Sequence, residues 1–317
     1  MSTASFVPET YELEGDDARE TLQRFGRMKL VKDAFQRFRA ADGFSHSRAL
    51  AFQVMLTAMP ALIALVAFTT VVNQDDLRRI VEKTLVGLAP GPASRVLTQA
   101  FEQGTSSGTT ALWVGLLAAL LAGTTAMGQL ERGANRIYGV EADRPTVRKY
   151  GLGFVLAITS GLLSVVAFVL LVGGGALRSA GEATGWSDTI LTVWALARWP
   201  VGIILAVGAV ALLFRKSPRR NQPAWSWLAY GSAVSALLWL AFTGLLALYL
   251  TASKSFGQTY GPLAGTVGAL VWAFLTSLAI YLGLAFAAQL EAVRAGVPVP
   301  KTGDERNEVP AKGRALT

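Results

Sequence analysis

Six long apolar segments are separated by polar connections along this chain. Each contains about 20 residues or more, which is enough for a helix to cross the hydrocarbon core of a bilayer. Strands of outer-membrane barrels alternate apolar and polar residues, and these continuous runs do not. The pattern predicts an all-α fold, a polytopic membrane protein with a bundle of six transmembrane helices in residues 42–294. The predicted spans are Ala49–Val72, Thr110–Gly128, Gly151–Val172, Val193–Phe214, Leu228–Leu250 and Leu263–Ala288.

Lysine and arginine are concentrated in alternate connections. The connections on one side, together with the two termini, carry 22 of the 29 basic residues. Those on the other side carry six, and Arg198 lies within the fourth span. Cytoplasmic loops of membrane proteins are enriched in basic residues. The distribution predicts an inner (plasma) membrane protein with both termini in the cytoplasm.

The segment 20–41, before the first span, has the spacing of an amphipathic helix. Apolar residues recur every three or four positions from Leu22 to Phe38, which places them on one helical face. A basic amphipathic helix beside a membrane is typical of one that lies along the lipid headgroups. We therefore predict headgroup contacts for four basic residues, Arg24, Arg27, Lys29 and Lys32. The alternative is a helix packed on the cytoplasmic loops.

Three further segments lie outside the predicted spans. Residues 1–19 are polar and acidic, and residues 295–317 are rich in proline, glycine and charge. Their low hydrophobicity predicts disorder at both ends of the chain. Residues 73–109 form the longest outer connection, where two short amphipathic helices are predicted on either side of a turn at residues 90–92.

The composition argues against several classes of chemistry. The chain has no cysteine and one histidine, so thiolate catalysis and a zinc site are not expected. It also lacks the nucleophile-elbow, zinc-protease and P-loop motifs. We predict no cofactor, no metal and no enzymatic activity. The net charge of +8 is explained by basic loops that face anionic headgroups, so membrane lipids rather than nucleic acid are the expected partners.

Arg198 is the only charged residue within the predicted spans. A charge at membrane depth is costly and often functional. We interpret Arg198 as a contact for an anionic substrate or a lipid headgroup, next to a kink at Pro200. The alternative is that the side chain lies near the outer end of its helix and extends to the membrane surface.

Polar stretches at the ends of two other spans complete the predicted substrate pathway. Before the sixth span, Tyr260 suits a membrane interface, and Gly257 and Gly261 allow a hinge or a close backbone approach. The alternative for this stretch is a plain turn. Three polar side chains after the second span are candidates for the cytoplasmic mouth of the pathway: Gln129, Asn135 and Arg136. The alternative there is a capped helix end with basic anchors.

Four stretches, in this order and spacing on six spans, resemble the YihY/virulence factor BrkB family of bacterial inner-membrane proteins, once labelled ribonuclease BN. They are Ser47–Phe52 leading to Pro60, Asn135–Val140, Thr259–Leu263 and Gly283–Glu291. The resemblance implies six helices and a cytoplasmic N-terminus. Members of this family often read G-A-E-L-N-A-E-L at the end of the last helix. Here Ala285 and Ala287 stand where an acidic and an amide residue would be, which puts in doubt any proton coupling through that carboxylate.

Together these features favour a transporter or a lipid-handling protein of the cell envelope. The alternative is an envelope scaffold that does not transport and binds other proteins through its amphipathic helix and outer loop. A ribonuclease is disfavoured, because a metal-dependent nuclease needs clustered acidic ligands. The predicted cytoplasmic loops offer only Glu131, Glu141 and Asp143.

Overall fold

A computed structural model describes residues 3–10, 12–71, 108–171, 178, 181–182, 185–253, 256 and 259–300. Over these ranges it contains eight α-helices, one short 3-10 helix and no strand. Six of the helices are long and apolar enough to cross a membrane, which confirms the predicted all-α fold with six spans. They are α3 (Gly43–Val71), α6 (Gly108–Ile137), α7 (Thr146–Leu171), α9 (Asp188–Lys216), α10 (Trp225–Ala252) and α12 (Ala264–Arg294).

One end of the bundle carries the connections that are rich in lysine and arginine, and we call it the basic end. α3, α7 and α10 begin there, and α6, α9 and α12 end there. α6 continues from the predicted boundary at Gly128 to Ile137, and α12 continues from Ala288 to Arg294. Hydropathy misses these last turns because their polar residues, such as Asn135 and Glu291, are buried against protein rather than in lipid.

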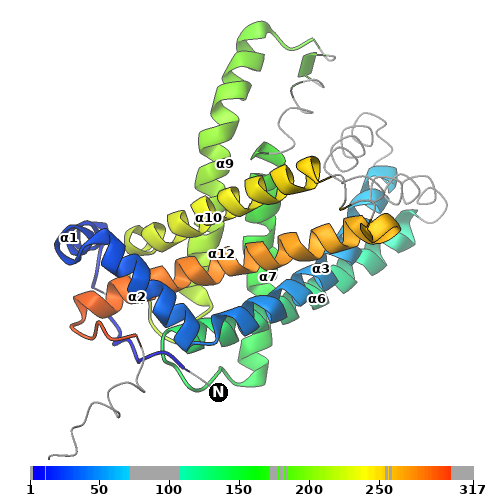
Figure 1. Cartoon of the computed structure of the whole chain (residues 1–317). Helices are drawn as coiled ribbons and strands as arrows, with labels where there is room; N and C mark the ends of the chain where they lie inside the picture. Colours follow the sequence, from blue (N-terminus) through cyan, green and yellow to red (C-terminus); the bar gives the residue numbers. More distant parts are fainter. Residues whose placement is uncertain are drawn as a thin grey trace, which may run out of the picture.

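The helices are packed most closely at the basic end. In Figure 1, α3, α6, α10 and α12 run alongside one another, and α7 and α9 form a pair inclined to them. The two groups meet at the basic end and diverge away from it. Burial follows the same gradient, because the buried residues of α10 all lie between Trp227 and Ser235. In α12 an unbroken buried run extends from Gly283 to Ala292.

A pair of glycines brings α10 and α12 into backbone contact at this end. A Cβ atom added to Gly231 would lie 2.8 Å from the carbonyl oxygen of Gly283 and 2.6 Å from the Cβ of Ala287. A Cβ atom on Gly283 would lie 2.6 Å from the carbonyl oxygen of Gly231. Small residues at such crossings let membrane helices approach closely. Ala287 lies in this contact, and Ala285 is also buried.

The predicted single helix over residues 20–41 is wrong, because the structure divides it. α1 (Gly15–Phe25) begins five residues earlier, and α2 (Arg27–Ala40) follows after Gly26. Gly26 has a φ of 90°, a conformation that glycine adopts without steric cost. Because of this break, α1 packs mainly against α10 and α2 packs mainly against α12.

The predicted disorder of residues 1–19 is also wrong for the described part of this segment. Ala4 and Val7 are buried, and α1 begins with a capping box between Glu14 and Asp17. The segment is acidic, and its acidic and polar groups find partners at the basic end, as the contact of Arg294 Nη2 with Asp17 Oδ1 at 2.9 Å illustrates. Residues 295–300 are likewise ordered, since Pro300 O accepts a hydrogen bond from Ser5 N at 3.0 Å.

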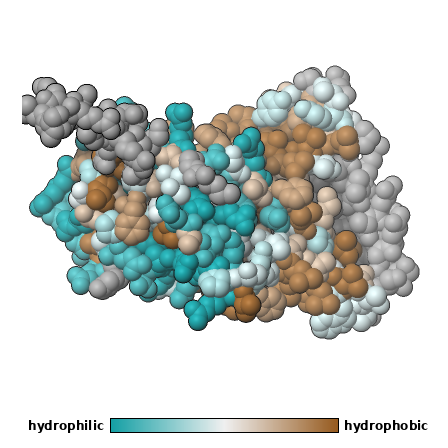
Figure 2. All heavy atoms as spheres, turned by 90° about the horizontal axis from the view of Figure 1, so that it is seen from below, coloured by the Kyte–Doolittle hydropathy of each residue, from teal (hydrophilic) through white to brown (hydrophobic). Residues whose placement is uncertain are grey.

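The hydropathy of the surface residues also changes along the axis of the bundle. Figure 2 shows hydrophilic residues covering the end that carries α1 and α2, and hydrophobic residues covering the part away from it. The exposed apolar residues of the six spans, such as Phe52, Met59 and Leu245, belong to this second part. The outer connection over 72–107, the tail from 301 to 317, and Gly257 lie outside the described residues.

Candidate functional site

Arg220 and Glu291 form an ion pair that is almost completely buried. Arg220 lies in the connection between α9 and α10, and Glu291 lies in the last turn of α12. Glu291 Oε1 accepts a hydrogen bond from Arg220 Nη2 at 2.6 Å, and Glu291 Oε2 accepts one from Arg220 Nη1 at 3.2 Å. The two side chains are 2% and 0% exposed. Thr10 Oγ1 donates a further bond to Glu291 Oε1 at 2.6 Å, so the partners of this carboxylate come from distant parts of the chain.

Arg37 is a second buried cation, and its hydrogen-bond partners are neutral. It is 0% exposed, and its Nε donates to Gln289 Oε1 at 2.7 Å. Its Nη1 donates to the carbonyl oxygens of Ser5 at 2.9 Å and Ile137 at 3.1 Å. Burial lowers the pKa of Arg37 to about 10, which still leaves it charged at neutral pH. We call Arg37, Arg220, Gln289 and Glu291 the buried cluster, which has a net charge of one positive unit.

The N-terminal segment (residues 3–10) crosses the buried cluster and joins three parts of the chain. Ala4 N donates to Arg136 O, and Val7 N donates to Tyr138 O, both at 3.1 Å. Further along, Pro8 O accepts a bond from Arg220 Nη2 at 2.9 Å. The segment therefore contacts the end of α6, the connection after α9 and the end of α12.

Further polar contacts join the α6–α7 connection to the α9–α10 connection. Arg144 Nη1 lies 3.0 Å from Glu131 Oε2, and Arg144 also donates to the carbonyl oxygens of Ser217 and Pro218 at 2.7 Å. Lys149 Nζ lies 2.7 Å from Asp143 Oδ2. Burial would raise the pKa of Asp143, but hydrogen bonds from Lys149 and Asn135 outweigh it and hold the pKa below its usual value. These charged groups thus join the α6–α7 and α9–α10 connections at the basic end.

Two buried nitrogen atoms, Arg220 Nε and Trp227 Nε1, have no hydrogen-bond partner among the described residues. Arg220 lies with its guanidinium carbon 4.5 Å from the centre of the Tyr138 ring. Burial raises the pKa of Tyr138 above its usual value, so this hydroxyl stays protonated. Buried polar atoms such as the two nitrogens are usually satisfied by a water molecule or a bound polar group.

Comparison with known proteins identifies the family. Residues 34–308 match the virulence factor BrkB family. This chain belongs to the BrkB family. The match covers all six spans and the buried cluster, and it confirms the resemblance carried by the four sequence stretches.

Three relatives show how far the similarity of this BrkB-family chain extends. It is 26% identical over 260 residues to a Bacillus subtilis protein named only as ribonuclease-like, YfkH, a match that covers 81% of this chain and 93% of the relative. It is 29% identical over 104 residues to a UPF0761 membrane protein of Idiomarina loihiensis, which covers 33% and 36% of the two chains. It is 24% identical over 181 residues to a UPF0761 membrane protein of Tolumonas auensis, covering 56% and 57%. No solved structure matches the chain significantly.

The three candidates at the end of α6 all take part in the closed basic end. Gln129 Nε2 lies 3.3 Å from His46 Nδ1 on α3. Asn135 is 0% exposed, and its amide accepts a bond from Arg219 N at 2.7 Å and donates one to Asp143 Oδ1 at 3.0 Å. Arg136 donates to the carbonyl oxygens of two residues just beyond α6, Val140 and Glu141. Their contacts are those of a capped and anchored helix end.

Arg198 lies on the half of α9 remote from the basic end. It is one helical turn from Gly202, where an added Cβ would lie 2.7 Å from the Leu171 side chain of α7. The guanidinium carbon lies 5.0 Å from the centre of the Trp199 ring, and Nε has no partner among the described residues. Pro200 is accommodated within the continuous helix.

Tyr260 and Gly261 lie at the end of the bundle opposite to the α6 candidates. Tyr260 is 42% exposed, and its ring centre lies 4.8 Å from that of Phe256. Gly261 has a φ of 48° and begins the 3-10 helix η1 (Gly261–Leu263) that precedes α12. Glycine adopts a positive φ without steric cost, which explains a glycine at this position. The five candidate pathway residues are therefore distributed over both ends of the molecule and do not converge on one site.

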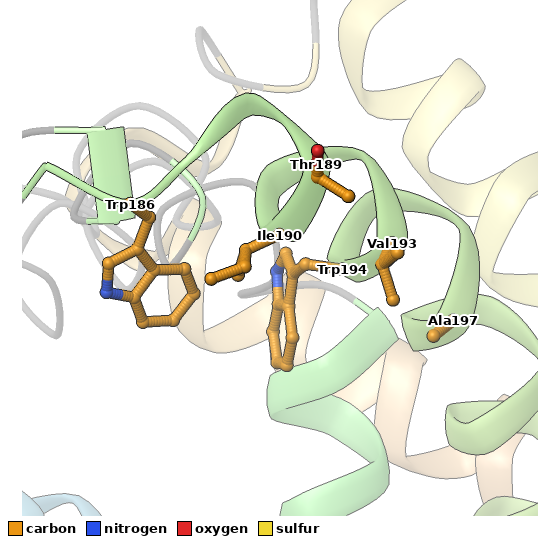
Figure 3. A pocket seen from close by; sticks show the side chains of 6 residues that line it. All are labelled: Trp186, Thr189, Ile190, Val193, Trp194 and Ala197. Carbon is orange, nitrogen blue, oxygen red and sulfur yellow. The ribbon is translucent and has the colours of Figure 1, made fainter.

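An apolar hollow lies on the surface of α9 near its start. Figure 3 shows two tryptophan side chains in this hollow, beside aliphatic groups. Its lining residues are Trp186, Thr189, Ile190, Val193, Trp194 and Ala197. Tryptophan is enriched where membrane helices meet the headgroup region, so the hollow fits the surface of a span at the membrane boundary.

The four predicted headgroup residues are divided by the break at Gly26. Arg24 lies on α1, where its Nη2 contacts Glu20 Oε1 at 2.6 Å. Arg27, Lys29 and Lys32 lie on α2 and are exposed. Lys29 Nζ lies 4.6 Å from the centre of the Phe25 ring.

Sequence reasoning missed the buried cluster altogether. Arg37 was one of many basic residues in an amphipathic segment, and Arg220 was one of four in a loop. Arg37 could be distinguished from the other basic residues only by knowing which face of α2 is buried. Leu30, Ala34 and Phe38 lie on the same buried face. Among the described residues, no group of three histidine, cysteine, aspartate or glutamate side chains could hold a metal ion.

Proposed function

We propose that this BrkB-family protein is a transporter or lipid-handling protein of the plasma membrane, with its basic end in the cytoplasm. In this proposal the basic end is the closed gate of a pathway between the helices. The substrate is an anion or an amphipathic lipid, and Arg198 is its candidate contact on the far side.

The observation that carries the proposal is the contrast between the two ends of the bundle. At the basic end, an N-terminal segment, two connections and the end of α12 are joined by buried ion pairs and hydrogen bonds. Away from it, the α7–α9 pair diverges from the other four spans (Figure 1). Close packing on one side of the bundle is what alternating access requires of a state that is closed on that side.

The orientation follows from charge. Basic residues are retained on the cytoplasmic side during membrane insertion, and the basic end carries the connections with most of the lysine and arginine. In this orientation the exposed bases of α2 face the anionic cytoplasmic leaflet.

Reconstitution into liposomes tests this function. Purified protein is incorporated into vesicles, and two rates are measured: the loss of fluorescent lipid from the protected leaflet and the efflux of an anion such as phosphate. We expect one of these rates to exceed that of protein-free vesicles. If both rates equal the control with folded protein present, the transport proposal fails and an envelope scaffold is favoured.

The name of the Bacillus relative defines a second assay. The same purified protein is incubated with RNA and Mg²⁺ or Mn²⁺, and cleavage is followed by gel electrophoresis. We expect no cleavage beyond the background of a mock purification. Cleavage that follows the protein through successive purification steps would replace the transport proposal by a nuclease.

A further inference from the structure

We propose that the corner formed by α2 and the start of α3 docks the headgroups of anionic lipids on the basic side of the membrane. The proposal rests on the membrane placement of the six spans and is independent of any transport activity. Its evidence is a second apolar face on α2, the depth of that face, and the charges beside it.

α2 has one face against protein and another that is exposed. Leu30, Ala34 and Phe38 are buried, and the helix packs against α12. On a different face, Met28 is 82% exposed, Val31 53% and Phe35 43%. Their spacing of three and four residues makes a continuous apolar stripe. Packing within the protein therefore leaves much of this stripe exposed among the described residues.

The stripe lies at the depth where α3 enters the membrane. α3 has 29 residues, so it is about 43 Å long at the usual helical rise, against a hydrocarbon core of about 30 Å. Arg39 and Arg48 flank its start, and basic residues mark the ends of spans on the cytoplasmic side, so its first residues are assigned to the headgroup region. Phe44, in the first turn of α3, has its ring centre 6.4 Å from that of Phe35. The stripe on α2 is therefore continuous with the surface of α3 that faces lipid.

Positive charge surrounds this apolar corner. Lys32 and Arg39 lie beside the stripe on the exposed side of α2, and Arg48 is exposed one turn after Phe44. Asp33 is half-buried and Asp42 is exposed, so the basic groups remain in excess. An apolar stripe flanked by lysine and arginine is the pattern of helices that bind anionic bilayer surfaces. The occupant we assign is consequently an anionic phospholipid such as phosphatidylglycerol.

Arg24 provides a matched control for this assignment. It has the same charge and lies a few residues away, but the positive φ of Gly26 places it on another helix. Its guanidinium is paired with Glu20. The predicted headgroup set is therefore refined: Lys32 and Arg39 belong to the docking corner, and Arg24 does not.

The test uses the full chain in lipid nanodiscs. The protein has no cysteine, so a single cysteine replaces Met28 and carries a fluorophore that shifts to the blue in apolar surroundings. Nanodiscs of phosphatidylcholine alone are compared with nanodiscs that include phosphatidylglycerol. A second labelled variant, Gln23→Cys on the exposed surface of α1, reports the background.

We expect a blue shift at position 28 that grows with the phosphatidylglycerol content, is reversed by salt, and is absent at position 23. Each basic residue near an anionic surface strengthens attachment to that surface. The double variant Lys32→Glu/Arg39→Glu should therefore lose at least about tenfold in apparent affinity, which removes the shift. Arg24→Glu should retain it, and soluble glycerophosphate should not compete.

Three results would overturn the docking assignment. The first is a fluorophore at position 28 that reports water in both kinds of nanodisc. The second is an equal blue shift in both, which would assign the stripe to lipid without selection for anionic headgroups. The third is an Arg24→Glu variant that loses the shift as fully as the double variant, which would show a general effect of net charge.

Discussion

Replacement of Glu291 by glutamine should destabilise the protein strongly, because it leaves the buried Arg220 without its counter-charge. Glu291 receives three hydrogen bonds, two of them from Arg220, and both side chains are almost fully buried. In Glu291→Gln one carboxylate oxygen becomes an amide that can only donate. Breaking one partner of a buried ion pair costs about 3–5 kcal/mol of unfolding free energy.

The matched control is Glu182→Gln, which also removes one carboxylate from one ion pair. Glu182 Oε1 lies 3.0 Å from Arg178 Nε, but the two side chains are 51% and 50% exposed. An exposed pair contributes about 0–1 kcal/mol. A third variant, Glu291→Met/Arg220→Met, removes both charges and should recover much of the loss, because a buried pair can often be replaced by apolar groups of similar volume.

The assay is equilibrium unfolding in mixed micelles, followed by tryptophan fluorescence at the same detergent composition for all variants. We expect Glu291→Gln to lose at least about 2 kcal/mol more than Glu182→Gln. Equal losses in the two single variants would refute the account of the buried cluster. A double variant that is less stable than Glu291→Gln would show that the pair itself contributes more than the account allows.

Three further predictions address topology, packing and Arg198. Single cysteines at Ala142 and Glu182, both exposed, should differ in whole cells: an impermeant thiol reagent should label position 182 and leave position 142 unlabelled unless the cells are permeabilised. Gly133→Ala should cost about 1–3 kcal/mol of stability by overpacking, because its Cβ would lie 2.5 Å from the Tyr281 ring. Gly151→Ala, which has open space, should be neutral or stabilising in the same unfolding assay. Arg198→Gln should lose most of the liposome flux at normal expression while Arg198→Lys retains part of it, and a fully active Arg198→Gln would remove this residue from the pathway.

The six spans could be predicted from the sequence because lipid imposes a strict requirement on them. Each needs about 20 apolar residues in a row, and few soluble folds produce such runs. The ends of the spans at the basic end were not predictable in the same way. Beyond Gly128, α6 continues through Asn135, which is buried against other polar groups. Hydropathy cannot distinguish a polar residue in water from one in a buried network.

The order of the N-terminus was missed because its partners are far away in the sequence. Thr10 contacts Glu291, and Arg37 contacts Gln289, each pair separated by more than 250 residues. The local composition indicated disorder, and no pattern within residues 1–19 indicates contacts with residues so far away in the sequence. The capping box formed by Glu14 and Asp17 was the one local signal of order. The candidate pathway residues were chosen for their chemistry alone, and the structure distributes them over both ends of the bundle.

The most direct test of the closed gate is to lock the start of α1 to α10 with a reversible disulfide. Gly15 N donates to Ser226 Oγ at 3.0 Å, and a Cβ at Gly15 would lie 3.1 Å from the Cβ of Ser226. This distance is near the range of about 3.5–4.5 Å found in disulfides, and the chain has no other cysteine. The Gly15→Cys/Ser226→Cys protein is reconstituted in liposomes, and its flux is measured before and after reduction, with each single-cysteine variant as control.

The account predicts that the oxidised double variant has little flux, that reduction restores it, and that the single variants do not respond to either treatment. Such a result requires the start of α1 to separate from the start of α10 during transport. Equal flux in the oxidised and reduced double variant, with the disulfide confirmed by mass spectrometry, would contradict the central claim that this network of contacts is the gate.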